Sequence, residues 1–348
     1  MGSIRFESVE STLVIRNPFS GFAPEEHRVE VRRDPLLGDT SVLNPSQSSK
    51  TGFSGVNDRA FIARLVEESA QGCIFCGERL DERTARYPDD IVPGGRLSRG
   101  EATLLPNLFA LGAYHPLVVL SRAHFLELPG FTPSLLVDGF AAAREFLRSV
   151  HRRDAAVRYA ALCANYLPPA GASLIHPHLQ LLATPVAYTR HERLLRACRS
   201  HHETHGSSCL DDLAREEQRL GQRYAARLGG WHWLAAYAPQ GCNEILAVHE
   251  AEQDLAALED DDLMALATGV SKALGFYGRL GLLSFNYALF SARREAPAEG
   301  FRLLLRIVSR QNLSPGYRND DYFLQKLLDA DVIVTPPEEL ARGLRGVF

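Results

Sequence analysis

The chain has 348 residues, of which 45% are hydrophobic and 23% charged, so it carries enough apolar side chains for a globular core. A formal net charge of −4 argues against a general nucleic-acid binder, although a local basic pocket for a phosphorylated small molecule stays possible. The sequence shows neither an apolar run long enough to cross a membrane nor the apolar core of a signal peptide. We therefore expect a cytoplasmic protein.

The first seventy residues are rich in turn formers, most clearly at 44–52, and we predict an irregular arm or lid over residues 1–70. Strand and helix patterns begin near residue 103. Apolar runs and alternating polarity predict strands over 117–120, 159–164 and 176–182, and apolar spacing predicts a helix over 138–150.

A similar order of elements returns after residue 230, which indicates an internal duplication. The segment Cys163-Ala164-Asn165-Tyr166 is similar to Ser284-Phe285-Asn286-Tyr287. The predicted elements of the second half are strands over 231–238, 244–248, 283–290 and 301–308 and a helix over 258–274. The predicted fold is therefore α+β, with antiparallel sheets and packed helices in two related halves. The division is an arm over 1–70, a first half over 71–185, connecting helices over 186–225 and a second half over 226–348.

Six cysteines are too few for a disulfide scaffold in a chain of this length, so the close pair Cys73 and Cys76 is better explained by metal or redox chemistry. The C-x-x-C spacing lets two thiolates bind one zinc ion. A structural zinc site has four ligands, and no second C-x-x-C exists, so two histidines from elsewhere would have to complete it. Two ordinary cysteines near a turn are the alternative.

A polar row interrupts the predicted strand at 176–182. Residues two apart on a strand point to one face, so His176, His178 and Gln180 would lie together. Gly171 and Ser173 stand just upstream, where backbone amides and a hydroxyl could hold phosphate oxygens. One histidine in a strand is usually structural, but this combination indicates a functional site.

These residues resemble the galactose-1-phosphate uridylyltransferase family of the histidine-triad superfamily, whose signature is Asn-x5-Gly-x-Ser-x2-His-Pro-His-x-Gln. Further similarity lies at 33–38, at the cysteine pair, and at 107–111 and 115–124, so the resemblance covers roughly residues 30–185. The signature positions in this chain are Asn165, Gly171, Ser173, His176, Pro177, His178 and Gln180.

The resemblance implies a histidine-triad-like fold in each half and a Zn²⁺ ion in the first. It also implies that His178 attacks the α-phosphorus of a nucleoside diphosphate sugar or dinucleotide and becomes covalently nucleotidylated, while Gln180 holds a phosphoryl oxygen. A homodimer is expected on the same basis. The implied zinc ligands are Cys73, Cys76, His124 and His176, and the implied nucleotide and phosphate contacts are Asn107, Phe109, Asn165, Gly171 and Ser173.

The second half departs from the family pattern, because Leu304-Leu305-Arg306 stands where better known members carry a second His-x-His. Arg306, Arg310 and Arg318 could hold a phosphorylated acceptor, with a solvated arginine-rich loop as the alternative. His115 could be a partly buried structural residue or face the cleft. His201, His205 and Cys209 would share one helix face, which we interpret as polar surface.

Three functions follow from these observations. The first is a nucleotidyltransferase that passes a nucleoside monophosphate to a phosphorylated small molecule in a ping-pong reaction through His178. The second is a phosphorylase or hydrolase of dinucleotides or nucleotide sugars that uses the same histidine. The third is an inactive, zinc-stabilised nucleotide-binding protein, against which the presence of both His178 and Gln180 argues.

Overall fold

The computed structural model describes residues 4–44, 57–317, 321 and 323–348, and two β-sheets organise them. Most of the loop predicted at 44–52 lies outside these ranges. In the larger sheet all neighbouring strands are antiparallel. In spatial order its ten strands are β4 (Leu97–Arg99), β5 (Ala102–Pro106), β6 (Pro116–Val119), β8 (His178–Thr184), β7 (Tyr159–Tyr166), β12 (Phe285–Ala292), β13 (Leu304–Ser309), β11 (Ile245–His249), β10 (Trp231–Ala235) and β9 (Tyr224–Leu228).

The strand order of the large sheet is the same from either edge. Three strands lead inward from each edge in chain order. The fifth strand of each half, β8 or β13, comes next, and the fourth strands, β7 and β12, meet in the middle. The seam between the halves is a continuous ladder of eight residue pairs, in which Asn165 lies opposite Asn286. The two similar sequence segments therefore face each other across the centre of the sheet.

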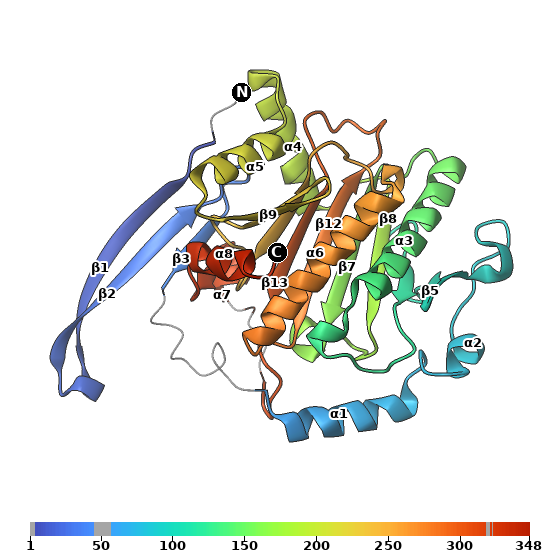
Figure 1. Cartoon of the computed structure of the whole chain (residues 1–348), viewed down its shortest axis with the longest axis horizontal. Helices are drawn as coiled ribbons and strands as arrows, with labels where there is room; N and C mark the ends of the chain where they lie inside the picture. Colours follow the sequence, from blue (N-terminus) through green and yellow to red (C-terminus); the bar gives the residue numbers. More distant parts are fainter. Residues whose placement is uncertain (1–3, 45–56, 318–320, 322) are drawn as a thin grey trace.

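One face of the large sheet is covered by two long helices that lie side by side, α3 and α6 (Figure 1). Leu179 and Leu181 of β8 and Leu162 of β7 point toward this layer and join Phe140 and Phe146 of α3 in the main core. The alternate residues of β8 are half-buried on the other face. The helices are α1 (Arg59–Gly72), α2 (Arg79–Arg83), α3 (Pro133–Arg153), α4 (Thr189–His205), α5 (Cys209–Leu220), α6 (Asp260–Arg279), α7 (Phe323–Leu327) and α8 (Pro337–Arg345).

The predicted α+β architecture of antiparallel sheets and packed helices is confirmed, with one parallel pair in the smaller sheet, β3 with β14. The order of this sheet is β1 (Glu7–Asn17), β2 (Ala23–Arg33), β3 (Thr40–Leu43) and β14 (Ala330–Ile333). None of the helices in the described ranges is long and apolar enough to span a membrane.

The prediction of an irregular segment over residues 1–70 is wrong for most of its described part. β1 and β2 form a long hairpin that extends away from the rest of the molecule (Figure 1), and α1 follows later. Val9, Leu13 and Val14 are all largely exposed, and nearly all of β1 is exposed on both faces. Because no face is buried, the sequence lacks the alternation that marks a half-buried strand.

The strand predicted at 176–182 begins two residues later, at His178. Pro177 has no N–H group to donate to a sheet ladder, and the preceding His176 turns its ring toward the cysteine pair instead. The strand predicted at 301–308 likewise begins at Leu304. Only His178 and Gln180 of the predicted polar row therefore share a strand.

Candidate active site and metal centre

Two cysteines and two histidines from separate segments of the first half come together in one cluster. Cys73 and Cys76 belong to the turn after α1, and His124 to the loop after β6. His176 stands two residues before the start of β8. One ligand atom from each of the four lies within 4.8 Å of the others. His176 Nδ1 is 3.6 Å from Cys73 Sγ and 3.4 Å from Cys76 Sγ.

The second nitrogen of each histidine is held by an outer partner. His124 Nε2 lies 2.8 Å from Ser69 Oγ, whose own proton goes to the Val66 carbonyl, and His176 Nε2 lies 2.7 Å from the Ser121 carbonyl oxygen. Both Nε2 atoms therefore donate, and both Nδ1 lone pairs face the sulfur atoms. Two imidazole nitrogens and two thiolates with such outer hydrogen bonds fit a tetrahedral zinc site.

The turn that carries the cysteines is fixed by local contacts. Gly77 has a positive φ of 58°, which a glycine adopts without strain, and Arg79 donates to the carbonyl oxygens of Ala70 and Cys73. Phe75 is 2% exposed and packs edge-on against the rings of His176 and His178. This phenylalanine, which sequence analysis did not single out, joins the cysteine turn to the strand that bears His178.

One ring nitrogen of His178 is hydrogen-bonded to the backbone. Its Nδ1 lies 2.8 Å from the His176 carbonyl oxygen, which can only accept, so Nδ1 carries the proton. Burial lowers the pKa of His178, and the hydrogen bond to His176 opposes that shift only in part. The ring is therefore neutral, and Nε2 keeps the lone pair that a nucleophile needs.

His178 lies in the wall of a cavity of about 480 Å³. Gln180 and Ser173 also line this cavity, as do Asn107 and Phe109 of the loop after β5. Phe109 is 82% exposed, so its ring is open to a ligand. Arg83, at the end of α2, also lines the cavity and brings a positive charge that sequence analysis missed.

Asn165 lies on β7 next to the seam, and its Oδ1 accepts a 2.7 Å hydrogen bond from Asn286 Nδ2. Gly171 has a φ of 83°, which explains the need for glycine, but its N–H donates to Pro168 O within the turn. The Gly171 N–H is therefore not free to hold a phosphate oxygen, contrary to the prediction. Gly171 instead shapes the turn.

The three arginines predicted to bind an acceptor have different positions. Arg306 is 9% exposed and forms two hydrogen bonds with the Glu244 carboxylate, at 2.6 and 3.1 Å, so its guanidinium is already occupied. We correct the prediction for Arg306 on this basis. Arg310 donates to Asn286 Oδ1 at 2.9 Å and so reaches the seam beside Asn165. Arg318 lies outside the described residues.

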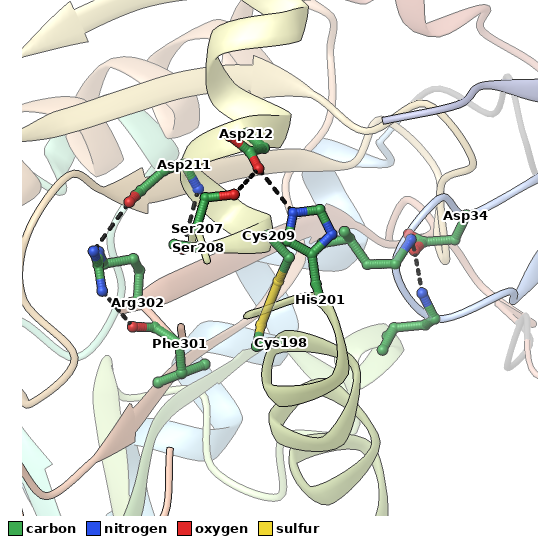
Figure 2. Close-up of a disulfide and its surroundings, with 12 residues drawn as sticks. Asp34, Cys198, His201, Ser207, Ser208, Cys209, Asp211, Asp212, Phe301 and Arg302 are labelled. Carbon is green, nitrogen blue, oxygen red and sulfur yellow. Dashed lines mark hydrogen bonds and ion pairs between the residues drawn. A yellow bond between two sulfur atoms is a disulfide. The ribbon is translucent and has the colours of Figure 1, made fainter. Parts of the chain in front are cut away.

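The prediction that His201, His205 and Cys209 share one helix face is wrong. α4 ends at His205, Gly206 follows with a φ of 69°, and Cys209 begins α5. Cys209 instead forms a disulfide with Cys198, a pairing that we did not expect, and Figure 2 shows His201 beside it with its ring directed at Asp212. The disulfide joins α4 to α5, and none of Cys198, His201, Cys209 and Asp212 lines the cavity that contains His178.

The sequence of the chain is similar to those of several other proteins. The chain is 29% identical over 325 residues to an uncharacterized protein of Archaeoglobus fulgidus, covering 93% of this chain and 94% of that one. It is 28% identical over 225 residues to the galactose-1-phosphate uridylyltransferase of Streptomyces lividans and 23% identical over 213 residues to the ADP-glucose phosphorylase of Arabidopsis thaliana. The latter matches cover 63% and 55% of this chain and 55% and 58% of those proteins. No family model matches.

Solved structures give the same fold. The ADP-glucose phosphorylase of Arabidopsis thaliana with bound ADP-glucose aligns with a TM-score of 0.71 at 17% identity, over 92% of this chain and 99% of that one. A uridylyltransferase mutant aligns with a TM-score of 0.64 at 17% identity, over 91% and 97%. The named relatives and these structures are galactose-1-phosphate uridylyltransferase-like proteins of the histidine-triad superfamily. The uridylyltransferase-like resemblance of the sequence motifs is thereby confirmed.

Proposed function

We propose that the protein is a uridylyltransferase-like nucleotidyltransferase that uses His178 as a covalent carrier of a nucleoside monophosphate. The observation that carries this proposal is the position of His178, a neutral ring with Nδ1–H bound to the His176 carbonyl and Nε2 left for attack, in the wall of a cavity of about 480 Å³. The similarity to a uridylyltransferase and to an ADP-glucose phosphorylase supports a nucleotide sugar as the donor.

In the first half-reaction Nε2 of His178 forms a bond to the α-phosphorus, and the bond from that phosphorus to the bridging oxygen breaks. The sugar phosphate leaves with the electron pair. The proton stays on Nδ1, so the nucleotidyl-histidine carries a positive charge that the His176 carbonyl stabilises. In the second half-reaction an acceptor oxygen attacks phosphorus, and the bond to Nε2 breaks.

A zinc ion held by Cys73, Cys76, His124 and His176 would serve as a structural centre, since all four coordination positions are filled by protein ligands. His176 contributes its ring to that centre and its carbonyl to His178. In this proposal these residues fix the orientation of the nucleophile, Asn107 and Phe109 contact the nucleoside, and Ser173 and Gln180 contact the phosphates. All four of the latter line the same cavity as His178, which supports these roles.

A phosphorylase reaction, with inorganic phosphate as the acceptor, is the second candidate. Arg306 is buried against Glu244 and does not open a site for a larger phosphorylated acceptor. A free phosphate requires fewer contacts, and its attack on the nucleotidyl-histidine would release a nucleoside diphosphate. A homodimer and a cytoplasmic location stay predictions.

Incubation with nucleotide sugars labelled at the α-phosphate tests the carrier. We expect the label on the wild-type protein, stable in alkali and lost in mild acid, as a phosphorus–nitrogen bond requires. His178→Asn should take no label, because asparagine keeps a donor near the Nδ1 position but has no atom in the place of Nε2. His202→Asn, on the exposed side of α4, is the matched control and should label normally. Label on His178→Asn would rule out this nucleophile.

A further inference from the structure

His115 directly precedes β6 and is 3% exposed, yet its ring contacts Asn107 and Gln180, which line the cavity. The Leu111 N–H donates to its Nδ1 at 3.0 Å, and its Nε2 lies 3.0 Å from Gln180 Oε1. From its place in the sequence, this histidine could be structural or functional. Asn107 Nδ2 also lies 3.4 to 3.5 Å from the two ring nitrogens, and the two shorter hydrogen bonds at 3.0 Å indicate which nitrogen carries the proton.

The backbone contact fixes the tautomer of His115. A backbone N–H can only donate, so Nδ1 must accept and cannot carry a proton. Burial lowers the pKa of His115, so the ring is neutral and its proton is on Nε2. Nε2–H therefore donates to Gln180 Oε1.

The orientation of the Gln180 amide follows from this donor. Because Oε1 accepts from His115, the NH₂ group is the end of the side chain left for the cavity. Gln180 lies two residues from His178 on β8, so both side chains point to the same face of the sheet. A flipped amide would present its oxygen to a negatively charged phosphate and repel it.

We propose that His115 is a positioning residue of the transfer reaction: it holds the Gln180 side chain with its NH₂ group toward the reacting phosphate. This inference rests on the function proposed above. The competing explanation is that His115 only anchors the loop at Leu111. The two explanations depend on different nitrogens of the same ring, so they can be separated.

A pair of substitutions replaces the two nitrogens one at a time. In His115→Gln the side-chain amide NH₂ lies near the place of Nε2 and can still donate to Gln180. In His115→Asn the side-chain oxygen lies near the place of Nδ1 and can still accept from Leu111, but the donor to Gln180 is lost. We expect His115→Asn to slow labelling of His178 at least about tenfold and His115→Gln to recover most of the rate, with nucleotide affinity little changed in both. Recovery by asparagine and loss with glutamine would overturn the proposal in favour of a loop anchor.

The Gln180→Ala background provides a second test. If His115 acts through Gln180, adding His115→Asn to Gln180→Ala should cause no further loss of labelling rate. A further tenfold loss in the double variant would contradict the positioning role. Zinc content and thermal unfolding of each variant show whether the fold is retained.

Long-range ¹H–¹⁵N NMR spectra of the wild-type protein report which ring nitrogen of His115 carries the proton. This measurement tests the inference independently of the proposed function. The expected result is a proton on Nε2 of His115, and a proton on Nδ1 overturns the inference whatever the activity. If the wild-type protein takes no label from any nucleotide sugar, the proposed function fails. In that case the NMR spectra still show whether His115 Nε2 carries the proton that it would donate to Gln180.

Discussion

At the scale of single residues, the candidate site depends on ring nitrogens that are assigned by neighbouring backbone groups. His176, His178 and His115 each have one nitrogen bound to a main-chain carbonyl or N–H. The signature residues could be found in the sequence because they stand close together in one segment. The outer partners could not, because Ser69, Ser121 and Asn286 are each separated from the residue they contact by many positions in the chain. The position of Arg83 in the cavity could not be predicted either, because no sequence pattern distinguishes it from the other charged residues nearby.

The outer hydrogen bond of His124 should affect metal affinity. Wild-type protein should contain one zinc per chain by elemental analysis. Ser69→Ala removes the oxygen that accepts from His124 Nε2, leaves the ring less fixed, and should weaken zinc binding by about tenfold or more in competition with a chelator. Ser134→Ala, at the exposed start of α3, is the control and should bind zinc like the wild type. Equal zinc affinity in the two variants would show that Ser69 does not support the site.

At the scale of elements, helices and strands were predictable where local signals mark their ends. α6 begins at Asp260, within the acidic run of the sequence, because negative side chains stabilise a helix N-terminus. α3 is longer than predicted, since Thr132 caps it and Pro133 occupies its first position. The β1–β2 hairpin was missed because almost none of its side chains is buried.

α4 contains a histidine that should make the fold sensitive to acid. His191 is 2% exposed among the rings of Tyr159, Phe290 and Phe301, and burial lowers its pKa to about 4. The fold therefore favours the neutral ring. Its contribution to stability is present above the unfolded pKa of about 6.5 and is lost as the pH falls toward the folded value.

Denaturant unfolding at several pH values measures this effect. Between about pH 7 and pH 5 the free energy of unfolding should fall by about 2 kcal/mol through His191 alone. His191→Phe should remove that part of the pH dependence, whereas His202→Phe, on the exposed side of the same helix, should leave it in place. An unchanged pH dependence in His191→Phe would contradict the assignment.

At the scale of the whole molecule, the two halves share one sheet and one core. The main core includes Phe140 of α3 and Trp233 of β10, which belong to different halves. The central pairing of β7 with β12 joins strands more than a hundred residues apart, and no local pattern predicts which distant strands pair. The symmetric strand order supports the internal duplication and the division into halves, which both stay proposals.

We expect the halves to unfold together. Both tryptophans, Trp231 and Trp233, are buried in the second half, whereas the proposed zinc ligands belong to the first. Tryptophan fluorescence and zinc release should therefore change at the same denaturant concentration, because the shared sheet transmits the loss of one half to the other. Two separate midpoints would show that the halves are independent folding units.

The strand order has a consequence for how many reaction centres the chain can hold. Continuing the ladder between β7 and β8 by one residue sets His178 beside Asn165, and the equivalent neighbour of Asn286 across the ladder between β12 and β13 is Val308. His178 and Val308 thus occupy equivalent positions beside the two central asparagines. A valine side chain has no nucleophilic atom and cannot carry a phosphoryl group. If His178 carries the nucleotide as proposed, each chain binds only one nucleotide covalently in this way. Asn286, from the half that lacks this histidine, instead donates a hydrogen bond to Asn165, the neighbour of His178.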